Sequence, residues 1–137
     1  MIADRSEHRH LDLDTVDNPG LHEGMTFVRR TLAAWNGAAT AGEREDIRLV
    51  ACELMTNAYT HSPGATALDL DRDGGRVTVA VTDSGGPRHP TVRPWSPQEP
   101  HGHGLHIVDR LATTWGVSPA TGGKTVWARL PWSTGPG

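Results

Sequence analysis

Two polar residues, Glu53 and Asn57, stand four positions apart in a stretch with helical spacing, so both side chains project from the same face of a helix. A carboxamide oxygen such as that of Asn57 suits Mg²⁺, which keeps most of its waters and completes its shell with phosphate oxygens. The Glu53 carboxylate would then be free to accept a proton. The same pair is also typical of a solvated polar strip on an amphipathic helix, so it needs support from other motifs.

A second motif, Asp83-Ser84-Gly85-Gly86, directly follows a stretch with the alternating pattern of a strand. An aspartate at a strand end can accept a hydrogen bond from an amino group such as that of adenine. Gly85, which lacks a side chain, allows a base to lie close to the backbone. These residues indicate a purine site, although four turn-forming residues are also typical of a plain turn.

A third motif, Gly102-His103-Gly104-Leu105, opens a short helical pattern. Glycines at a helix N-terminus expose backbone N–H groups that bind phosphate oxygens, and the helix dipole favours the negative charge. The alternative is an ordinary helix start. We place His103 near the phosphates rather than in a zinc site with His101 and His106, because zinc sites normally combine four ligands in a set geometry.

Three helices are needed to position these motifs. Apolar residues recur at steps of three and four from Asn18 to Trp35, and again from about Gly42 to His61, where Pro63 and Gly64 follow. These patterns predict two amphipathic helices, the second of which contains Glu53 and Asn57. A third, shorter helix is predicted over residues 105–111.

Strands and one long loop complete the organisation. Alternation from Ala67 to Asp83 around Asp73-Gly74-Gly75 predicts a hairpin, and a last hairpin is predicted around Gly122-Gly123. Residues 84–104 hold five prolines without apolar periodicity, and loops longer than about 12–15 residues in small domains are often lids. We therefore expect an α/β (α+β) two-layer sandwich with a mixed, mainly antiparallel sheet and helices on one face.

Size and composition restrict the class of protein. A chain of 137 residues fits a single domain, and its first ten residues are too polar for a secretory signal. Cys52 is the one cysteine, so no intramolecular disulfide forms and a reducing, cytoplasmic location is expected. No apolar run is long enough for a membrane helix. The net charge of −3 disfavours direct binding to nucleic acid.

The order of the motifs is more specific than any one of them. Glu53-Leu-Met-Thr-Asn57-Ala58, Asp83-Ser-Gly85-Gly86, Gly102-His-Gly104-Leu105 and Gly123-Lys-Thr125 together resemble the GHKL ATPases, which have the Bergerat fold. The resemblance covers about residues 18–131 and implies one ATP-binding domain over residues 1–137, with an ATP lid at about 86–101 and flexible termini.

The resemblance also implies a role for each motif residue. Asn57 would hold magnesium, Asp83 would bind the adenine amino group, and Gly85 would lie against the base. The phosphates would contact the segment Gly102, His103, Gly104 and Leu105, and Thr125 would lie near the adenine.

Within the superfamily, the stretch from Glu53 to Ala58 is similar to the signature of stand-alone bacterial anti-sigma factor serine kinases. Such proteins bind Mg-ATP and a sigma factor, and they phosphorylate a serine on a STAS-type anti-anti-sigma protein. The resemblance implies that Glu53 is the catalytic base and that the chain forms a homodimer. The alternative is a non-catalytic module that binds ATP and sequesters a partner without phosphoryl transfer.

Overall fold

The computed structural model describes residues 6–13, 20–35, 37–61, 64–84 and 103–134. Over these ranges the elements are β1 (Ser6–Asp12), α1 (Gly20–Ala34), α2 (Ala41–His61), β2 (Ala65–Asp73), β3 (Arg76–Asp83), α3 (His103–Leu111), β4 (Thr114–Ala120) and β5 (Gly123–Pro131). The expected lid, residues 86–101, lies outside the described residues, as do Gly85 and Gly102.

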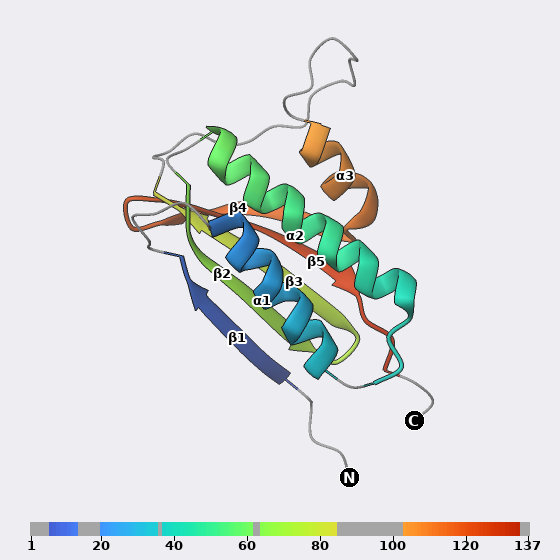
Figure 1. The fold of residues 1–137 in the computed structure, drawn as a ribbon. Helices are drawn as coiled ribbons and strands as arrows, with labels where there is room; N and C mark the ends of the chain where they lie inside the picture. The colour runs from blue at the N-terminus through green and yellow to red at the C-terminus, as the bar shows by residue number, and fades with distance from the viewer. Residues whose placement is uncertain (1–5, 14–19, 36, 62–63, 85–102, 135–137) are drawn as a thin grey trace.

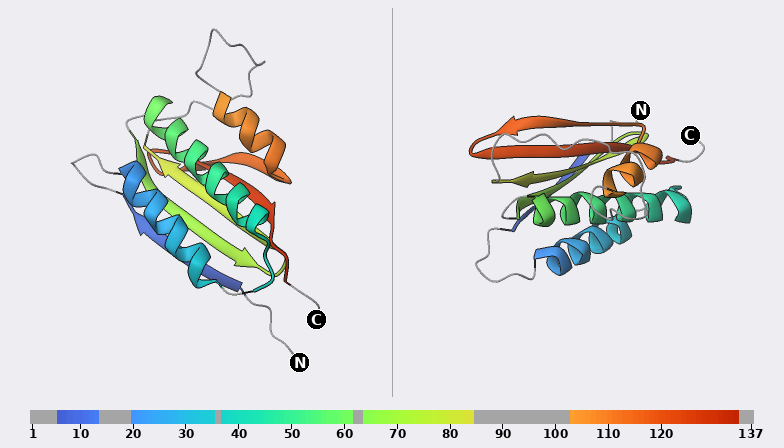
Figure 2. Two further views of the ribbon diagram at one scale, coloured as in Figure 1. Left: turned by 45° about the vertical axis from the view of Figure 1, so that its right-hand side comes forward. Right: turned by 90° about the horizontal axis from the view of Figure 1, so that it is seen from above.

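The described strands form one sheet in the order β1-β2-β3-β5-β4. Helices α1, α2 and α3 lie on one face of this sheet, as the two views in Figure 2 show. The expected α+β two-layer sandwich is therefore confirmed. Every neighbouring pair among the described strands is antiparallel, so the expectation of a mixed sheet is not met there.

The β2–β3 hairpin shows how the alternating sequence produces two different faces. Its register pairs Leu68 with Val81 and Leu70 with Val79, and all four side chains are buried under the helices. Gly74 in the turn has a φ of 59°, a left-handed conformation that a residue without Cβ adopts at no steric cost. Side chains between these apolar positions consequently point to the helix-free face.

The core lies between the helices and the inner face of the sheet. Its largest fully buried side chains are Trp35, Ile47, Leu54, Met55, Leu68, Leu70, Leu130, Val28, Val50, Val77, Val79 and Val81. Burial of one such aliphatic side chain contributes roughly 1.5–3 kcal/mol. The apolar faces of the helices and of the sheet therefore stabilise each other. Within the described part of the chain, no helix is long and apolar enough to span a lipid bilayer.

The start of α2 is fixed by a capping box. Glu43 Oε1 accepts a hydrogen bond of 2.9 Å from the Thr40 backbone N–H, and Thr40 Oγ1 accepts one of 3.0 Å from the Glu43 N–H. The same carboxylate accepts hydrogen bonds from the N–H and the hydroxyl of Ser133. The tail was expected to be frayed from Ser133 onward, but Ser133 is held against α2; residues 135–137 lie outside the described ranges.

Strand β1 was not predicted. The N-terminal segment was expected to be flexible, yet Ser6–Asp12 pairs along its whole length with β2. The segment was missed because an edge strand with one solvated face needs few apolar residues, and Leu11 is the one aliphatic side chain that β1 packs against the core.

Candidate functional site

Helix α2 lies between α1 and α3 on the sheet (Figure 1), so one of its flanks faces α1 and the other faces α3. Met55 faces α1, because a Cβ placed on Gly24 of α1 would lie 2.6 Å from Met55 Cε. Residues advance by about 100° along a helix, so Glu53 and Asn57 lie on the opposite flank, toward α3. Both side chains are half-buried. The predicted pair is therefore on one helix face, as its spacing required.

The electrostatic environment of Glu53 suits a proton acceptor. Burial raises the pKa of the Glu53 carboxyl above its ordinary value, because the charged form loses hydration. A more basic carboxylate is a stronger acceptor at neutral pH as long as it remains ionised. Asn57, one turn further along α2, offers the neutral oxygen donor that Mg²⁺ accepts.

Asp83, at the end of β3, is buried and ion-paired. Its Oδ2 lies 2.9 Å from Nζ of Lys124, and the two residues stand opposite each other in the register of β3 with β5. Asp83 and Lys124 are 3% and 6% exposed, on the same sheet face as the core valines. The ion pair fixes the direction of the Asp83 carboxylate and gives it a partner of opposite charge in a poorly hydrated place.

Gly123 positions the Asp83 backbone. A Cβ on Gly123 would lie 1.8 Å from the Asp83 carbonyl oxygen and 2.8 Å from Ser84 Cα. Real Cβ atoms do not approach so closely, so only glycine permits β5 to pass this close to the end of β3. The glycine of the Gly123-Lys-Thr125 motif thus acts on the predicted adenine-binding residue through backbone packing.

The structure does not bring the Thr125 side chain to Asp83. Thr125 lies on the opposite sheet face, where its Oγ1 is 2.8 Å from Thr82 Oγ1. Strand side chains alternate between faces, so Lys124 and Thr125 cannot both point toward Asp83, and Lys124 takes that place. Lys124 was not among the predicted site residues. Two features of the sequence could have identified it: this alternation, and the fact that it is the only lysine in the chain.

Helix α3 begins at His103, as the third motif predicted, and it packs against α2. Gly104 and Leu105 both belong to its first turn. The side chain of Leu105 is 3% exposed and fills the space under the helix, so only its backbone N–H is suited to a phosphate. Leu105 therefore anchors the helix start rather than facing a ligand with its side chain.

These pieces converge at one end of the molecule. In Figure 1 the last turns of α2, the end of β3, the beginning of β5 and the N-terminus of α3 all lie toward the upper end. A separate cavity of about 450 Å³ lies elsewhere, between Leu11 of β1 and the α1 residues from His22 to Thr31. None of its lining residues belongs to the predicted nucleotide site.

Fold and site together define an α+β domain with an acidic strand end, a polar flank on one helix and the N-terminus of another. The model of the histidine kinase-like ATPase domain family matches residues 19–130, from the start of α1 into β5. The chain belongs to this family. Membership indicates ATP binding and an activity of the kinase or ATPase type. No curated protein matches the chain.

Proposed function

We propose that the chain binds Mg-ATP and transfers its γ-phosphoryl group to a serine of a STAS-type anti-anti-sigma protein, while the ATP-loaded form binds a sigma factor. The single observation that carries the catalytic part is the pair on α2: Glu53 has a pKa raised by burial and lies one turn from Asn57. Family membership supports the ATP-binding part. The resemblance of the Glu53–Ala58 segment to anti-sigma factor kinases supports the choice of partners.

In this proposal each residue has a defined task. Asn57 would hold Mg²⁺ through its carboxamide oxygen. Asp83, whose carboxylate is ion-paired with Lys124, accepts a hydrogen bond from the adenine amino group. A carboxylate has about four lone-pair positions, so the ion pair with Lys124 leaves Asp83 able to accept further hydrogen bonds. Backbone N–H groups in the first turn of α3 bind phosphate oxygens.

The transfer step needs one proton acceptor. The serine hydroxyl oxygen attacks the γ-phosphorus, and the bond from that phosphorus to the bridging oxygen breaks, which releases ADP. Glu53 takes the hydroxyl proton. In phosphoryl transfer the protein mainly positions groups and neutralises charge, so this set of residues is sufficient in kind.

The partner assignment extends the proposal beyond the pocket. We propose a homodimer in the cytoplasm that contacts proteins rather than nucleic acid, in keeping with a net charge of −3. Co-purification with sigma factors and STAS proteins encoded by the same genome would test the partners, and light scattering would test the dimer.

Two substitutions in α2 test the site. Asn57→Ala should abolish binding of Mg-ATP measured by calorimetry, whereas Glu53→Gln should keep the affinity for Mg-ATP and lose phosphoryl transfer to the STAS partner. Thr56→Ala, at an exposed position between them, is the matched control and should leave both unchanged. Wild-type binding without any transfer would favour the non-catalytic module that sequesters its partner in an ATP-dependent way. Unchanged binding by Asn57→Ala would show that the magnesium assignment is wrong.

A further inference from the structure

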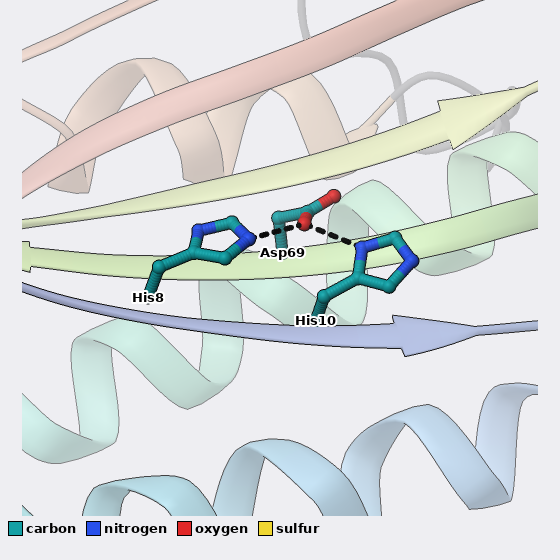
Figure 3. Close-up of side chains that lie close together, drawn as sticks. All are labelled: His8, His10 and Asp69. Carbon is teal, nitrogen blue, oxygen red and sulfur yellow. Dashed lines mark hydrogen bonds and ion pairs between the residues drawn. The ribbon is translucent and has the colours of Figure 1, made fainter.

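Two histidines of β1 converge on one aspartate of β2, on the sheet face that carries no helix. His8 Nε2 lies 3.1 Å from Asp69 Oδ1, and His10 Nδ1 lies 2.7 Å from the same oxygen. Figure 3 shows both rings directed at this carboxylate from the neighbouring strand. The ligand atoms of the three residues lie within 4.8 Å of one another, a spacing at which they could share one metal ion.

The strand geometry produces this convergence. His8 and His10 are two positions apart, so their side chains leave β1 on the same face. The register pairs His10 with Asp69 and His8 with Asp71. Leu68 and Leu70, the chain neighbours of Asp69, are fully buried on the helix side, which places Asp69 on the outer face with the two imidazoles. The ligand set is thus fixed by β-sheet pairing rather than by a loop.

Each imidazole has a carboxylate on its other nitrogen. His8 Nδ1 lies 2.5 Å from Asp71 Oδ1, and His10 Nε2 lies 2.8 Å from Asp12 Oδ1. Histidines that bind metals commonly donate their second ring N–H to a carboxylate, which fixes the tautomer and the orientation of the ring. Here both histidines already have such an outer partner, and the inner nitrogens both face Asp69.

The spacing of the ligand atoms suits a small divalent ion. Ligands bound to tetrahedral zinc at about 2.0–2.1 Å lie about 3.3 Å from one another. The two nitrogen–oxygen distances of 3.1 and 2.7 Å would have to open by about 0.2 and 0.6 Å to reach this spacing. The side chains of His8, His10 and Asp69 are 55%, 45% and 20% exposed, so the ion could enter directly from solvent.

The charge around the site also favours a cation. Three carboxylates, those of Asp12, Asp69 and Asp71, contact the two imidazoles and supply negative charge. Arg9, the basic residue between the two histidines, pairs instead with Glu7 at 3.2 Å. In the absence of a metal, the short contacts are ordinary exposed hydrogen bonds and ion pairs, which contribute little to stability.

We propose that His8, His10 and Asp69 bind a divalent transition-metal ion of the Zn²⁺ type, with at least one coordination position open to solvent. Two imidazoles and one carboxylate suit Zn²⁺, Cu²⁺ or Ni²⁺ rather than Mg²⁺, so this site is chemically distinct from the nucleotide site. The metal would link the edge strand β1 to β2. His8 and His10 precede the matched residues 19–130, whereas Asp69 lies within them.

The test uses the full chain without nucleotide. Calorimetric titration with ZnCl₂ should show one tight site, and Co²⁺ should give the visible absorption bands of a tetrahedral or five-coordinate complex. His10→Ala and Asp69→Asn should each weaken Zn²⁺ binding by at least 100-fold, and Asp12→Asn, which removes only an outer partner, by about 10- to 100-fold. His22→Ala, an exposed histidine of α1, should leave the affinity unchanged.

Thermal unfolding separates loss of the ligand from loss of the fold. Saturating Zn²⁺ should raise the melting temperature of the wild type and of His22→Ala but not of Asp69→Asn, because an ion that binds only the folded state must stabilise it. The metal-free melting temperatures of wild type and Asp69→Asn should be similar. Zinc binding that survives in the double variant His8→Ala/His10→Ala would overturn the proposal. The absence of binding at Zn²⁺ concentrations of about 100 micromolar, roughly a hundred thousand times above a nanomolar dissociation constant, would overturn it too.

Discussion

Lys124 Nζ and Asp83 Oδ2 form an ion pair of 2.9 Å that joins the beginning of β5 to the end of β3. Their side chains are only 7% and 2% exposed, so the pair is shielded from water and from salt. It places the only lysine of the chain against the carboxylate that the adenine amino group is expected to contact. The direction of the Asp83 carboxylate therefore depends on Lys124, a residue inside the Gly123-Lys-Thr125 motif that was not among the predicted site residues.

Removal of one partner of this pair should be costly. Lys124→Met leaves the buried Asp83 carboxylate without its counter-charge, and we expect a loss of about 3–5 kcal/mol in the free energy of unfolding. Urea unfolding measures this loss. The double variant Asp83→Asn/Lys124→Met removes both charges and should recover much of the stability, whereas equal losses in single and double variants would show that the ion pair is not the cause.

Gly123 should tolerate no side chain. In Gly123→Ala the new methyl group would collide with the Asp83 carbonyl, so we expect lower stability and at least tenfold weaker Mg-ATP binding, because β3 and β5 must separate where the base is expected. Gly75→Ala is the control, since its Cβ would have its nearest contact at 3.9 Å, an ordinary van der Waals distance. Melting curves and ATP titrations of both variants decide the matter; similar behaviour would contradict the role assigned to Gly123.

Glu43 should make stability depend on pH in the acid range. Hydrogen bonds from the Thr40 N–H, then from the N–H and hydroxyl of Ser133, lower the pKa of the Glu43 carboxyl. A lowered folded-state pKa gives stability that is present above the ordinary glutamate range and is lost as the pH falls through the folded pKa. Glu43→Gln should therefore cost about 1 kcal/mol at pH 7, in line with other helix caps.

The destabilisation by Glu43→Gln should shrink as the pH is lowered through the acid range, because the wild-type carboxyl also becomes protonated there. Chemical unfolding at a series of pH values measures it. Glu45→Gln on the same helix is a control for the loss of an exposed carboxylate, because an exposed ion pair such as that of Glu45 with Arg48 contributes little to stability. A constant difference at all pH values would contradict the explanation.

Glu53 should have the opposite effect on stability. Its pKa is raised by burial, so the wild type loses stability as the pH rises from the ordinary glutamate range through the folded-state pKa. Glu53→Gln should therefore be as stable as the wild type or more stable at pH 7, while transfer is lost. The transfer rate of the wild type should also fall on acidification. This fall should occur at a higher pH than it would for a catalytic glutamate with an ordinary pKa. Transfer assays from pH 4 to 8 at saturating Mg-ATP measure this fall in rate. A rate independent of pH would contradict a role of Glu53 as the base.

Local patterns predicted most of the architecture. Helix α2 and strands β2 and β3 were predicted correctly. The apolar residues of α2 recur at helical spacing, and those of β2 and β3 alternate as expected for strands. Glu53 and Asn57 were placed on one helix flank for the same reason. Strand β1 was missed, since its apolar content is small and its pairing with β2 involves residues about sixty positions away.

The amino-acid sequence by itself determined the type and order of the helices and the later strands, because those follow from periodicity over short stretches. Only the tertiary structure decided which distant groups meet: Asp83 with Lys124 rather than Thr125, Gly123 against the Asp83 backbone, and His8 and His10 with Asp69. The physical reason is strand register. A shift of one residue between paired strands moves every side chain to the other face, and that register is set by the packing of the whole sheet under its helices.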